Sequence, residues 1–284
     1  VSKIGIKHIN LLYENQHKLY NYPLGKASLT DEENDYLEKY LDVTKSQLFF
    51  AKGVIFVEGI SEAILVPEFA KLINRPLDMY AVELVNINGV GFSPFAKMMR
   101  APDQDAGFAR ASIITDDDRC SNKEETTYIS KDLDFNDNLT GITDKIDHGT
   151  PSDRYKSIAA LCSNNIVKCF GSIKTFEYAL ALEPNNIAYM LNAIISTYPI
   201  AGLKLKDKVE ETSNQQLKAL MIWLFVRSRN SAKAQVAQAL GRALRKQSQA
   251  KENGETVGAP FIVPQYIKDA IYNATTGETP VSEE

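Results

Sequence analysis

The sequence is poor in cysteine, histidine and tryptophan, and this scarcity excludes several kinds of site. It holds three cysteines, three histidines and one tryptophan among 284 residues. Cys120, Cys162 and Cys169 are spaced unlike any zinc motif, and such a sparse, odd set favours a reducing cytoplasm over a disulfide framework. The histidines match no catalytic spacing, so a general-base histidine is not expected.

Long apolar runs and an excess of basic residues are also absent. No run of about 18 apolar residues occurs and no signal peptide is recognisable, so no membrane span is expected. The net charge of −4 argues against binding of nucleic acid by bulk charge alone, although not against a local basic groove. A phosphate loop of the form GxxxxGK followed by Ser or Thr is missing too. The chain begins at Val1 rather than Met, and we expect it to be part of a longer, cytoplasmic protein.

What is present is an alternation of apolar strands with helical patterns. The continuous apolar run 54–57 is typical of a strand covered on both faces. Residues 61–73 have helical spacing with Pro67 inside it, so this helix is expected to kink or to begin later. Further strands are predicted at 82–87, 112–115 and 166–170. Together these patterns predict an α/β fold with a mainly parallel sheet flanked by helices.

The same patterns divide the chain into successive parts. Residues 1–46 are predicted to be a helical lead-in, 47–186 the α/β domain, and 187–284 an all-helical domain. The helical domain contains a basic helix at 231–251 and, after Asn253, a tail that is expected to be disordered apart from the core-forming stretch 261–272, with 273–284 frayed. Residues 124–153 hold eight acidic residues against two lysines, which predicts a surface excursion from the α/β domain.

Acidic residues follow the ends of the predicted strands. Glu58 and Glu62 come after the first strand, Asp116 and Asp118 after the third, and Glu177 after the fourth. Because sites in open α/β sheets form beyond the carboxyl ends of the strands, we expect these carboxylates to lie together. They would repel one another unless a cation neutralised them, and such oxygen ligands suit Mg²⁺ or Mn²⁺. Two such ions can activate a water and stabilise the leaving oxygen in phosphodiester cleavage.

Each part of this acidic pattern has a plainer interpretation when taken alone. An Asp-x-Asp sequence at a strand end is often a turn or a helix cap. Glu62 could be a first-turn glutamate favoured by the helix dipole, and Glu177 could be an ordinary residue on a helix surface. The coincidence of all three at successive strand ends favours a metal site over these alternatives.

The order of the motifs resembles that of a known family. VEGxSE, a glycine loop and TDDD follow one another in Toprim domains, the metal-binding fold of topoisomerases, bacterial primases and several nucleases. More specifically, the chain resembles the OLD-family (overcoming lysogenization defect) nucleases, to which the Gabija phage-defence nuclease is closely related. The segments that carry this resemblance are 48-LFFAKGVIFVEGISEAILVPEFAKLI-73, 86-NINGVGF-92, 113-IITDDDR-119, 174-KTFEYALAL-182 and 233-KAQVAQAL-240.

The resemblance implies an architecture and an activity. Family members join an N-terminal ABC-type ATPase to a C-terminal Toprim nuclease, so this chain corresponds to the C-terminal part. Residues 47–186 would be its Toprim catalytic domain, and the ATPase domain would be its partner. The family implies metal-dependent cleavage of DNA, including nicking, by a two-metal mechanism with Mg²⁺ or Mn²⁺. Ca²⁺ is expected to be a non-productive or structural substitute.

The resemblance also implies roles for individual residues. Glu58, Asp116 and Lys233 are the expected catalytic residues. Asp117 is not expected to be a ligand, because alternation along the strand points it away from its neighbours. The acidic positions that correspond to metal ligands are Glu58, Glu62, Asp116, Asp118 and Glu177.

A basic stretch near the C-terminus is the predicted DNA-binding surface. It runs from Arg227 to Lys251 without an acidic residue, and such a stripe can neutralise DNA phosphates with weak sequence preference. The alternative is a solvated helix face. The residues that are expected to contact DNA are Arg227, Arg229, Arg242, Arg245 and Lys246.

Lys233 stands on the apolar stripe of the same predicted helix. Ala237, Leu240 and Leu244 lie within about 40° of it on a helix of 100° per residue. Its stem could simply pack there while its ammonium reaches water. The resemblance instead implies that the ammonium points at the acidic site and stabilises charge on the scissile phosphate.

Two further functions stay open at this point. A non-catalytic Toprim module that binds DNA or a partner would be favoured by the loss of one metal position. Relatives often carry another acid shortly after Glu177, but here Ala179 is apolar and no acid occurs before Glu183. A primase-like nucleotidyl transferase would need a nucleotide site, for which no phosphate-cradling motif is evident. A topoisomerase would need a nucleophilic tyrosine, and no motif singles one out.

Overall fold

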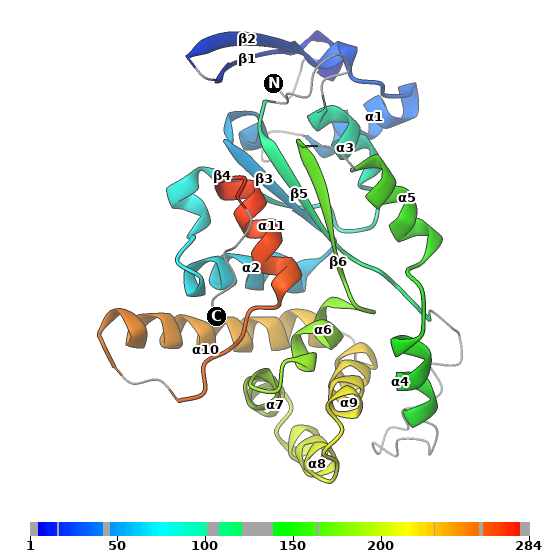
Figure 1. Cartoon of the computed structure of the whole chain (residues 1–284), viewed down its shortest axis with the longest axis vertical. Coiled ribbons are helices and arrows are strands. Elements are labelled where there is room, and N and C mark those ends of the chain that lie inside the picture. Colours follow the sequence, from blue (N-terminus) through cyan, green and yellow to red (C-terminus); the bar gives the residue numbers. More distant parts are fainter. Residues whose placement is uncertain are drawn as a thin grey trace.

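The centre of the protein is a four-stranded parallel sheet (Figure 1). Its strands are β3 (Gly53–Val57), β4 (Val82–Asn86), β5 (Arg110–Asp116) and β6 (Val167–Ser172), in the order β4-β3-β5-β6. All neighbouring strands run parallel, so the predicted strands and the parallel sheet are confirmed. The computed structural model describes residues 5–15, 17–41, 46–100, 108–120, 139–162, 165–229, 231–255 and 258–278.

Strand β3 lies in the middle of the core, which explains its continuous apolar run. Successive side chains of a strand point to opposite faces of the sheet. Ile55 accordingly joins the core cluster that contains α2 (Ile60–Leu72), whereas Phe56 joins the cluster that contains α3 (Ser93–Met99). Helix α2 begins directly after β3 and continues through Pro67, so the expected late start of this helix is wrong.

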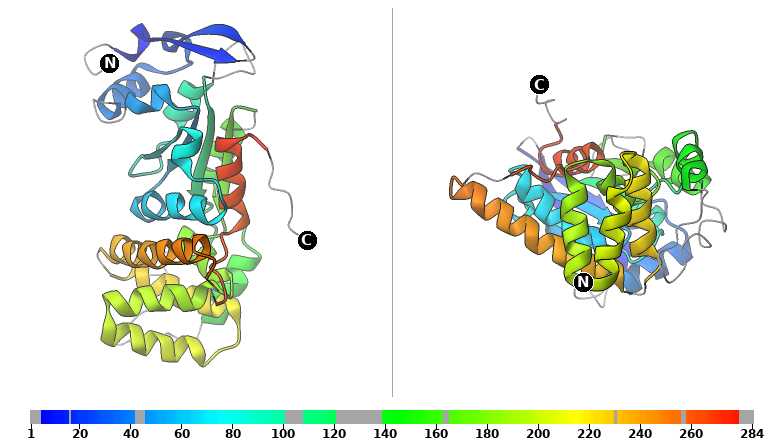
Figure 2. Two further views of the ribbon diagram at one scale, coloured as in Figure 1. Left: turned by 90° about the vertical axis from the view of Figure 1, so that its left-hand side faces the viewer. Right: turned by 90° about the horizontal axis from the view of Figure 1, so that it is seen from below.

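A set of helices follows the last strand. Helix α10 packs against both α2 and α7, and Figures 1 and 2 show it lying between the sheet and the lower helices. None of the helices in the described ranges is both long and apolar enough to cross a membrane. The helices of this part are α6 (Phe176–Leu182), α7 (Asn186–Thr197), α8 (Pro199–Glu210), α9 (Gln215–Arg227) and α10 (Ala232–Glu252).

The C-terminal helix α11 (Gln265–Thr275) returns to the sheet and packs on β5 (Figure 2). The hydroxyl of Ser112 donates to the carbonyl of Ala270 at 2.7 Å, and the amide of Asn273 donates to the carbonyl of Ala111 at 3.2 Å. Helix α11 lies mostly within the stretch 261–272 that was predicted to form core, and residues 273–275, predicted to be frayed, continue it. Residues 279–284 lie outside the described part of the chain.

The N-terminal region is only partly helical. Helix α1 (Asp31–Tyr40) begins with a reciprocal capping box formed by Thr30 and Glu33. Before it, however, β1 (Asn10–Asn15) and β2 (Lys18–Pro23) form an antiparallel hairpin, so a purely helical lead-in is wrong. Figures 1 and 2 show this hairpin at the end of the molecule opposite α7 and α8.

The described part of the predicted acidic excursion consists mainly of a helix, with a short non-helical connection at 148–152. Helix α4 (Leu139–Asp147) buries Ile142 and Ile146, and α5 (Asp153–Leu161) begins soon after it. The predicted excursion therefore contains regular helix in this part, whereas 121–138 lies outside the described residues. Short 3-10 turns occur at Ile6–His8, Leu24–Lys26, Ser46–Phe50 and Leu77–Tyr80.

Candidate active site at the carboxyl ends of the sheet

The register of the parallel strands brings the predicted acidic residues to one edge of the sheet. Val57 of β3 pairs with Ile114 of β5, and Asp116 at the end of β5 pairs with Ser172 of β6. Glu58 directly follows β3, so it lies beside the last residues of β5. Glu62 and Glu177 occupy the first turns of α2 and α6, the helices that follow β3 and β6.

Asp116 is the central carboxylate of this edge. Its Oδ1 accepts hydrogen bonds of 2.8 Å from the Ser172 hydroxyl and 2.8 Å from the Phe176 backbone N–H, which fix the orientation of the group. Burial, with the nearby charges of Glu58 and Glu177, raises the pKa of Asp116 well above its usual value. Both causes disfavour the ionised form of Asp116 in the absence of a cation.

Glu62 and Glu177 form a buried pair next to Asp116. Burial, and then repulsion from Glu177, raises the pKa of Glu62 to about 7. The Ser61 hydroxyl donates to Oε1 of Glu177 at 3.0 Å, which holds that side chain toward α2. Both glutamates are almost fully buried, so neither is the ordinary surface residue that each would be on an isolated helix.

Lys233 reaches this pair from the first turn of α10. Its Nζ lies 3.5 Å from Oε2 of Glu177, and the ammonium points at the acidic edge while about half of the side chain stays exposed. The carboxylates of Glu177, then Asp116 and Glu62, raise the pKa of Lys233 and keep it charged. Ser231 stands at the N-cap but makes no capping hydrogen bond through its side chain.

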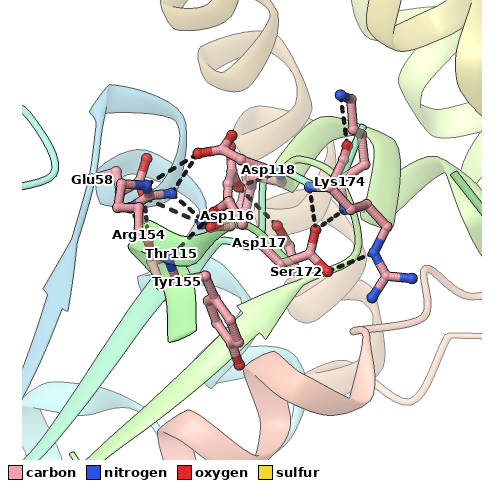
Figure 3. Close-up of polar contacts among 12 residues, drawn as sticks. Glu58, Thr115, Asp116, Asp117, Asp118, Arg154, Tyr155, Ser172 and Lys174 are labelled. Atoms are coloured by element: carbon pink, nitrogen blue, oxygen red, sulfur yellow. Dashed lines mark hydrogen bonds and ion pairs between the residues drawn. The ribbon is translucent and has the colours of Figure 1, made fainter. Parts of the chain in front are cut away.

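Glu58 and Asp118 are held by an arginine that the sequence patterns did not single out. Arg154, in the first turn of α5, donates through Nη1 to Oε1 of Glu58 at 3.0 Å and through Nη2 to Oδ2 of Asp118 at 2.7 Å (Figure 3). Thr115 also donates to Oε1 of Glu58. Arg154 lies within the segment expected to be a surface excursion, and only its place at a helix start after 151-PSD-153 could have indicated a structural role.

Asp117 turns away from its two neighbours, as the alternation of strand side chains predicted. It accepts from Nε of Arg119 at 2.7 Å and from the backbone N–H of Lys174 at 2.9 Å. The Lys174 ammonium is buried over the ring of Trp223 and donates to the carbonyls of Arg119 and Cys120 at 2.9 and 3.0 Å. This network anchors the loop that carries the aspartates.

Tyr266 of α11 is a second residue of the site that the motifs did not reveal. Its hydroxyl is buried, and burial raises the pKa of Tyr266 well above its usual value, with Asp116, Glu62 and Glu177 adding to the rise. A phenol held neutral in this way is a hydrogen-bond donor rather than an ionised nucleophile. The only signal in the sequence was the core-forming character of 261–272.

Comparison with known proteins agrees with this arrangement. Residues 49–118 match the family model described as the Toprim domain of overcoming lysogenization defect protein-like proteins. This segment is an OLD-like Toprim domain. The match runs from the end of the turn before β3 to Asp118, and it confirms the predicted resemblance. A search of the curated proteins gave no match.

Two solved structures are similar to this chain over about four fifths of its length. The C-terminal region of the OLD protein of Xanthomonas campestris pv. campestris has 22% identity and a TM-score of 0.47, covering 81% of this chain and 94% of that one. The C-terminal region of the Burkholderia pseudomallei OLD protein has 21% identity and a TM-score of 0.43, covering 79% and 97%.

The carboxylates of the Toprim domain are gathered but do not yet converge on one point. Within the described ranges, no three Asp, Glu, His or Cys side chains are arranged so that they could hold one metal ion. The chemistry of the donor set nevertheless fits a hard divalent cation. Five carboxylates face two cations, Arg154 and Lys233, at this edge, and burial followed by repulsion between the carboxylates raises the pKa values of Glu62 and Asp116, so a bound cation would favour their ionised forms.

The predicted DNA-binding stripe is not a uniform surface. Nη1 of Arg245 pairs with the buried Glu68 at 2.9 Å, and Arg229 lies 3.6 Å above the Phe225 ring. On a helical wheel Arg242 is about 180° from Lys233, so it faces away from the acidic edge. Lys246 is about 140° from Lys233, and Arg227 stacks over Trp223 at 5.0 Å.

Proposed function

We propose that this chain is a metal-dependent DNA endonuclease or nickase, the nuclease part of an OLD-like protein. The observation that carries the proposal is the gathering of buried carboxylates at and beyond the ends of β3, β5 and β6, with the Lys233 ammonium 3.5 Å from one of them. Buried groups with strongly perturbed pKa values and a specific charged partner are typical of catalytic sites. The match of residues 49–118 to the OLD-like Toprim domain supports the same conclusion.

The contacts of the site support a role for each side chain. The residues that would hold Mg²⁺ or Mn²⁺ are Glu58, Glu62, Asp116, Asp118 and Glu177, with Ca²⁺ as a non-productive or structural substitute. When bound, two such ions would supply an activated water and stabilise the leaving oxygen. Ser172 and the Phe176 backbone orient Asp116, and Thr115 orients Glu58. Lys233 provides a fixed positive charge for the scissile phosphate.

The proposal extends to the partners of the chain. DNA is the substrate, bound through its phosphates with weak sequence preference. The residues proposed to contact it are Arg227, Arg229, Arg242, Arg245 and Lys246. An N-terminal ABC-type ATPase domain of the full-length protein is the covalent partner, and the protein acts in the cytoplasm. The family match at residues 49–118 supports the ATPase partner, and the acid-free basic stretch from Arg227 to Lys251 supports the contact with phosphates.

A non-catalytic Toprim module that binds DNA or a partner is the second candidate. Two observations favour it. No three carboxylates among the described residues are arranged to hold one metal ion, and Arg154 and Lys233 already pair with Glu58 and Glu177. The absence of an acid between Glu177 and Glu183 points in the same direction. A primase-like transferase has no comparable observation in its favour.

Cleavage of supercoiled plasmid by the purified chain separates these candidates. Parallel reactions with Mg²⁺, Mn²⁺, Ca²⁺ or EDTA are resolved as supercoiled, nicked and linear DNA. The nuclease produces nicked or linear DNA with Mg²⁺ or Mn²⁺ and none with EDTA. Plasmid that is retarded on a gel but stays supercoiled under every condition would identify a binding module and overturn the proposed activity.

A further inference from the structure

Arg154 bridges two of the acidic residues with both arms of its guanidinium. Nη1 donates to Glu58 Oε1 and to the Thr115 hydroxyl, each at 3.0 Å. On the other arm, Nη2 and Nε donate to Oδ2 of Asp118 at 2.7 and 3.1 Å, and Nη2 also donates to the carbonyl of Asp116 at 2.7 Å (Figure 3). Charge-assisted bonds in a planar fork of this kind are strong and geometrically specific.

This bridge divides the acidic edge into two unequal halves. In one half, Glu58 and Asp118 share the guanidinium charge of Arg154. In the other half, Glu62, Asp116 and Glu177 are buried, and their cation is the half-exposed Lys233 at 3.5 Å from Glu177. The second half therefore has the greater excess of negative charge and should take up a divalent cation first.

A cation at the first half has to compete with the arginine. Oε1 of Glu58 and Oδ2 of Asp118 are the atoms that contact the guanidinium, so an ion that uses them must displace it. The guanidinium is not sealed in, because the side chain of Arg154 is 25% exposed and that of Asp118 is 39% exposed.

We propose that Arg154 withholds Glu58 and Asp118 from a second divalent cation until a DNA phosphate draws the guanidinium away. A phosphate offers arginine the same bidentate geometry as a carboxylate, so the exchange keeps the arginine paired while it releases two metal ligands. DNA binding and loading of the second ion then become coupled, and each strengthens the other by the same factor. This inference rests on the proposed nuclease function and specifies how its site is assembled.

The test measures Mn²⁺ binding rather than cleavage. Calorimetric titration and Mn²⁺ electron paramagnetic resonance give the number of ions per chain and their affinities, with and without a short duplex of phosphorothioate DNA that resists cleavage. The wild-type chain should bind one ion tightly without DNA and two with DNA. Arg154→Met should bind the second ion roughly tenfold or more tightly than wild type without DNA. Added DNA should then produce no further increase in that variant.

Matched variants separate this coupling from a simple change of charge. Lys156→Met removes a positive charge two residues later on the same helix, where Lys156 makes only an exposed pair of 3.5 Å with Asp153. It should keep the wild-type binding pattern. Arg154→Lys is the substitute test if Arg154→Met does not fold. It keeps the positive charge but lacks the planar guanidinium, so it should bind the second ion more tightly than wild type without DNA.

The outcomes distinguish this inference from the function on which it rests. Two equally tight ions in the wild-type chain without DNA, or a count that DNA does not change, would overturn the role of Arg154 and leave the metal site standing. Failure of every variant to bind Mn²⁺, with or without DNA, would overturn both proposals.

Discussion

At the scale of single residues, the site is a balance between carboxylates and two cations from distant parts of the chain. Arg154 comes from α5 and Lys233 from α10, and neither lies on the strands that carry the acids. The sequence indicated the acids because strand ends are readable from apolar runs. It indicated Lys233 only through the family resemblance, and it gave no signal for Arg154, whose role depends on how α5 packs beside β6.

Lys233→Met tests the second of these cations. Methionine keeps an unbranched stem but removes the charge that lies beside Glu177, so we expect plasmid cleavage to fall by ~10²-fold or more. Lys251→Met, in the last turn of the same helix, is the control and should cleave normally. Near-normal cleavage by a well-folded Lys233→Met protein would reduce the lysine to a packing residue.

Glu62 should make the stability of the metal-free protein depend on pH. Its pKa rises from 4.5 to about 7 on folding, so between these values the folded state binds more protons than the unfolded state. The contribution of this group to stability is therefore fully present below pH 4.5 and is lost as the pH rises through 7, by up to roughly 3 kcal/mol. Asp116 acts in the same direction, because its pKa is raised as well.

Thermal unfolding in EDTA across this pH range checks the prediction. Glu62→Gln should flatten the decline, whereas Glu210→Gln, at an exposed pair on α8, should leave it unchanged. An equally steep decline of stability in Glu62→Gln would show that the pKa of Glu62 is not raised by its burial.

At the scale of helices and strands, the elements that could be predicted are those that are buried or exposed evenly along their length. Strand β3 is buried along its whole length, so its sequence is apolar throughout. The hairpin of β1 and β2 was missed because its exposed Leu12 and Leu19 break the alternation, and because the turn between Asn15 and Lys18 contains no glycine. The sequence predicted that α10 carries basic residues. It could not show which of these residues form ion pairs within the protein.

Arg245 is the clearest case of such an engaged residue. It pairs at 2.9 Å with Glu68, which is only 7% exposed, whereas Arg245 itself is about half exposed. Arg245→Gln should therefore lower the free energy of unfolding by roughly 1–2 kcal/mol, less than for a fully buried pair. Arg242→Gln, on an exposed part of the same helix, should leave urea unfolding unchanged. Equal stability of the two variants would contradict a structural role for Arg245.

At the scale of the whole molecule, the α/β layer is closed by the C-terminus. Helix α11 packs on β5 through Ser112 and Asn273, which are both buried. Composition and periodicity divide a chain into consecutive parts, so they could not show that a late helix completes an early sheet. The parallel sheet itself was predictable, since strands alternate with helices along the chain.

A truncated chain provides the corresponding prediction. A fragment of residues 47–186 lacks α11 and exposes the apolar face that this helix covers, so we expect it not to unfold cooperatively in urea. The chain of residues 1–278 keeps α11 and should unfold with a single sharp transition. A cooperative transition of the 47–186 fragment with an unchanged far-ultraviolet spectrum would contradict this account of the fold.

The central claim is that carboxylates at the strand ends perform metal-dependent cleavage, and adjacent aspartates test it most directly. Asp116 faces Glu58 and Glu177, whereas Asp117 faces Arg119 on the other side of the strand. Rates of plasmid nicking with Mn²⁺ are compared for Asp116→Asn and Asp117→Asn. We predict a loss of roughly 10²-fold or more for Asp116→Asn and less than tenfold for Asp117→Asn. Wild-type nicking by Asp116→Asn would contradict the claim.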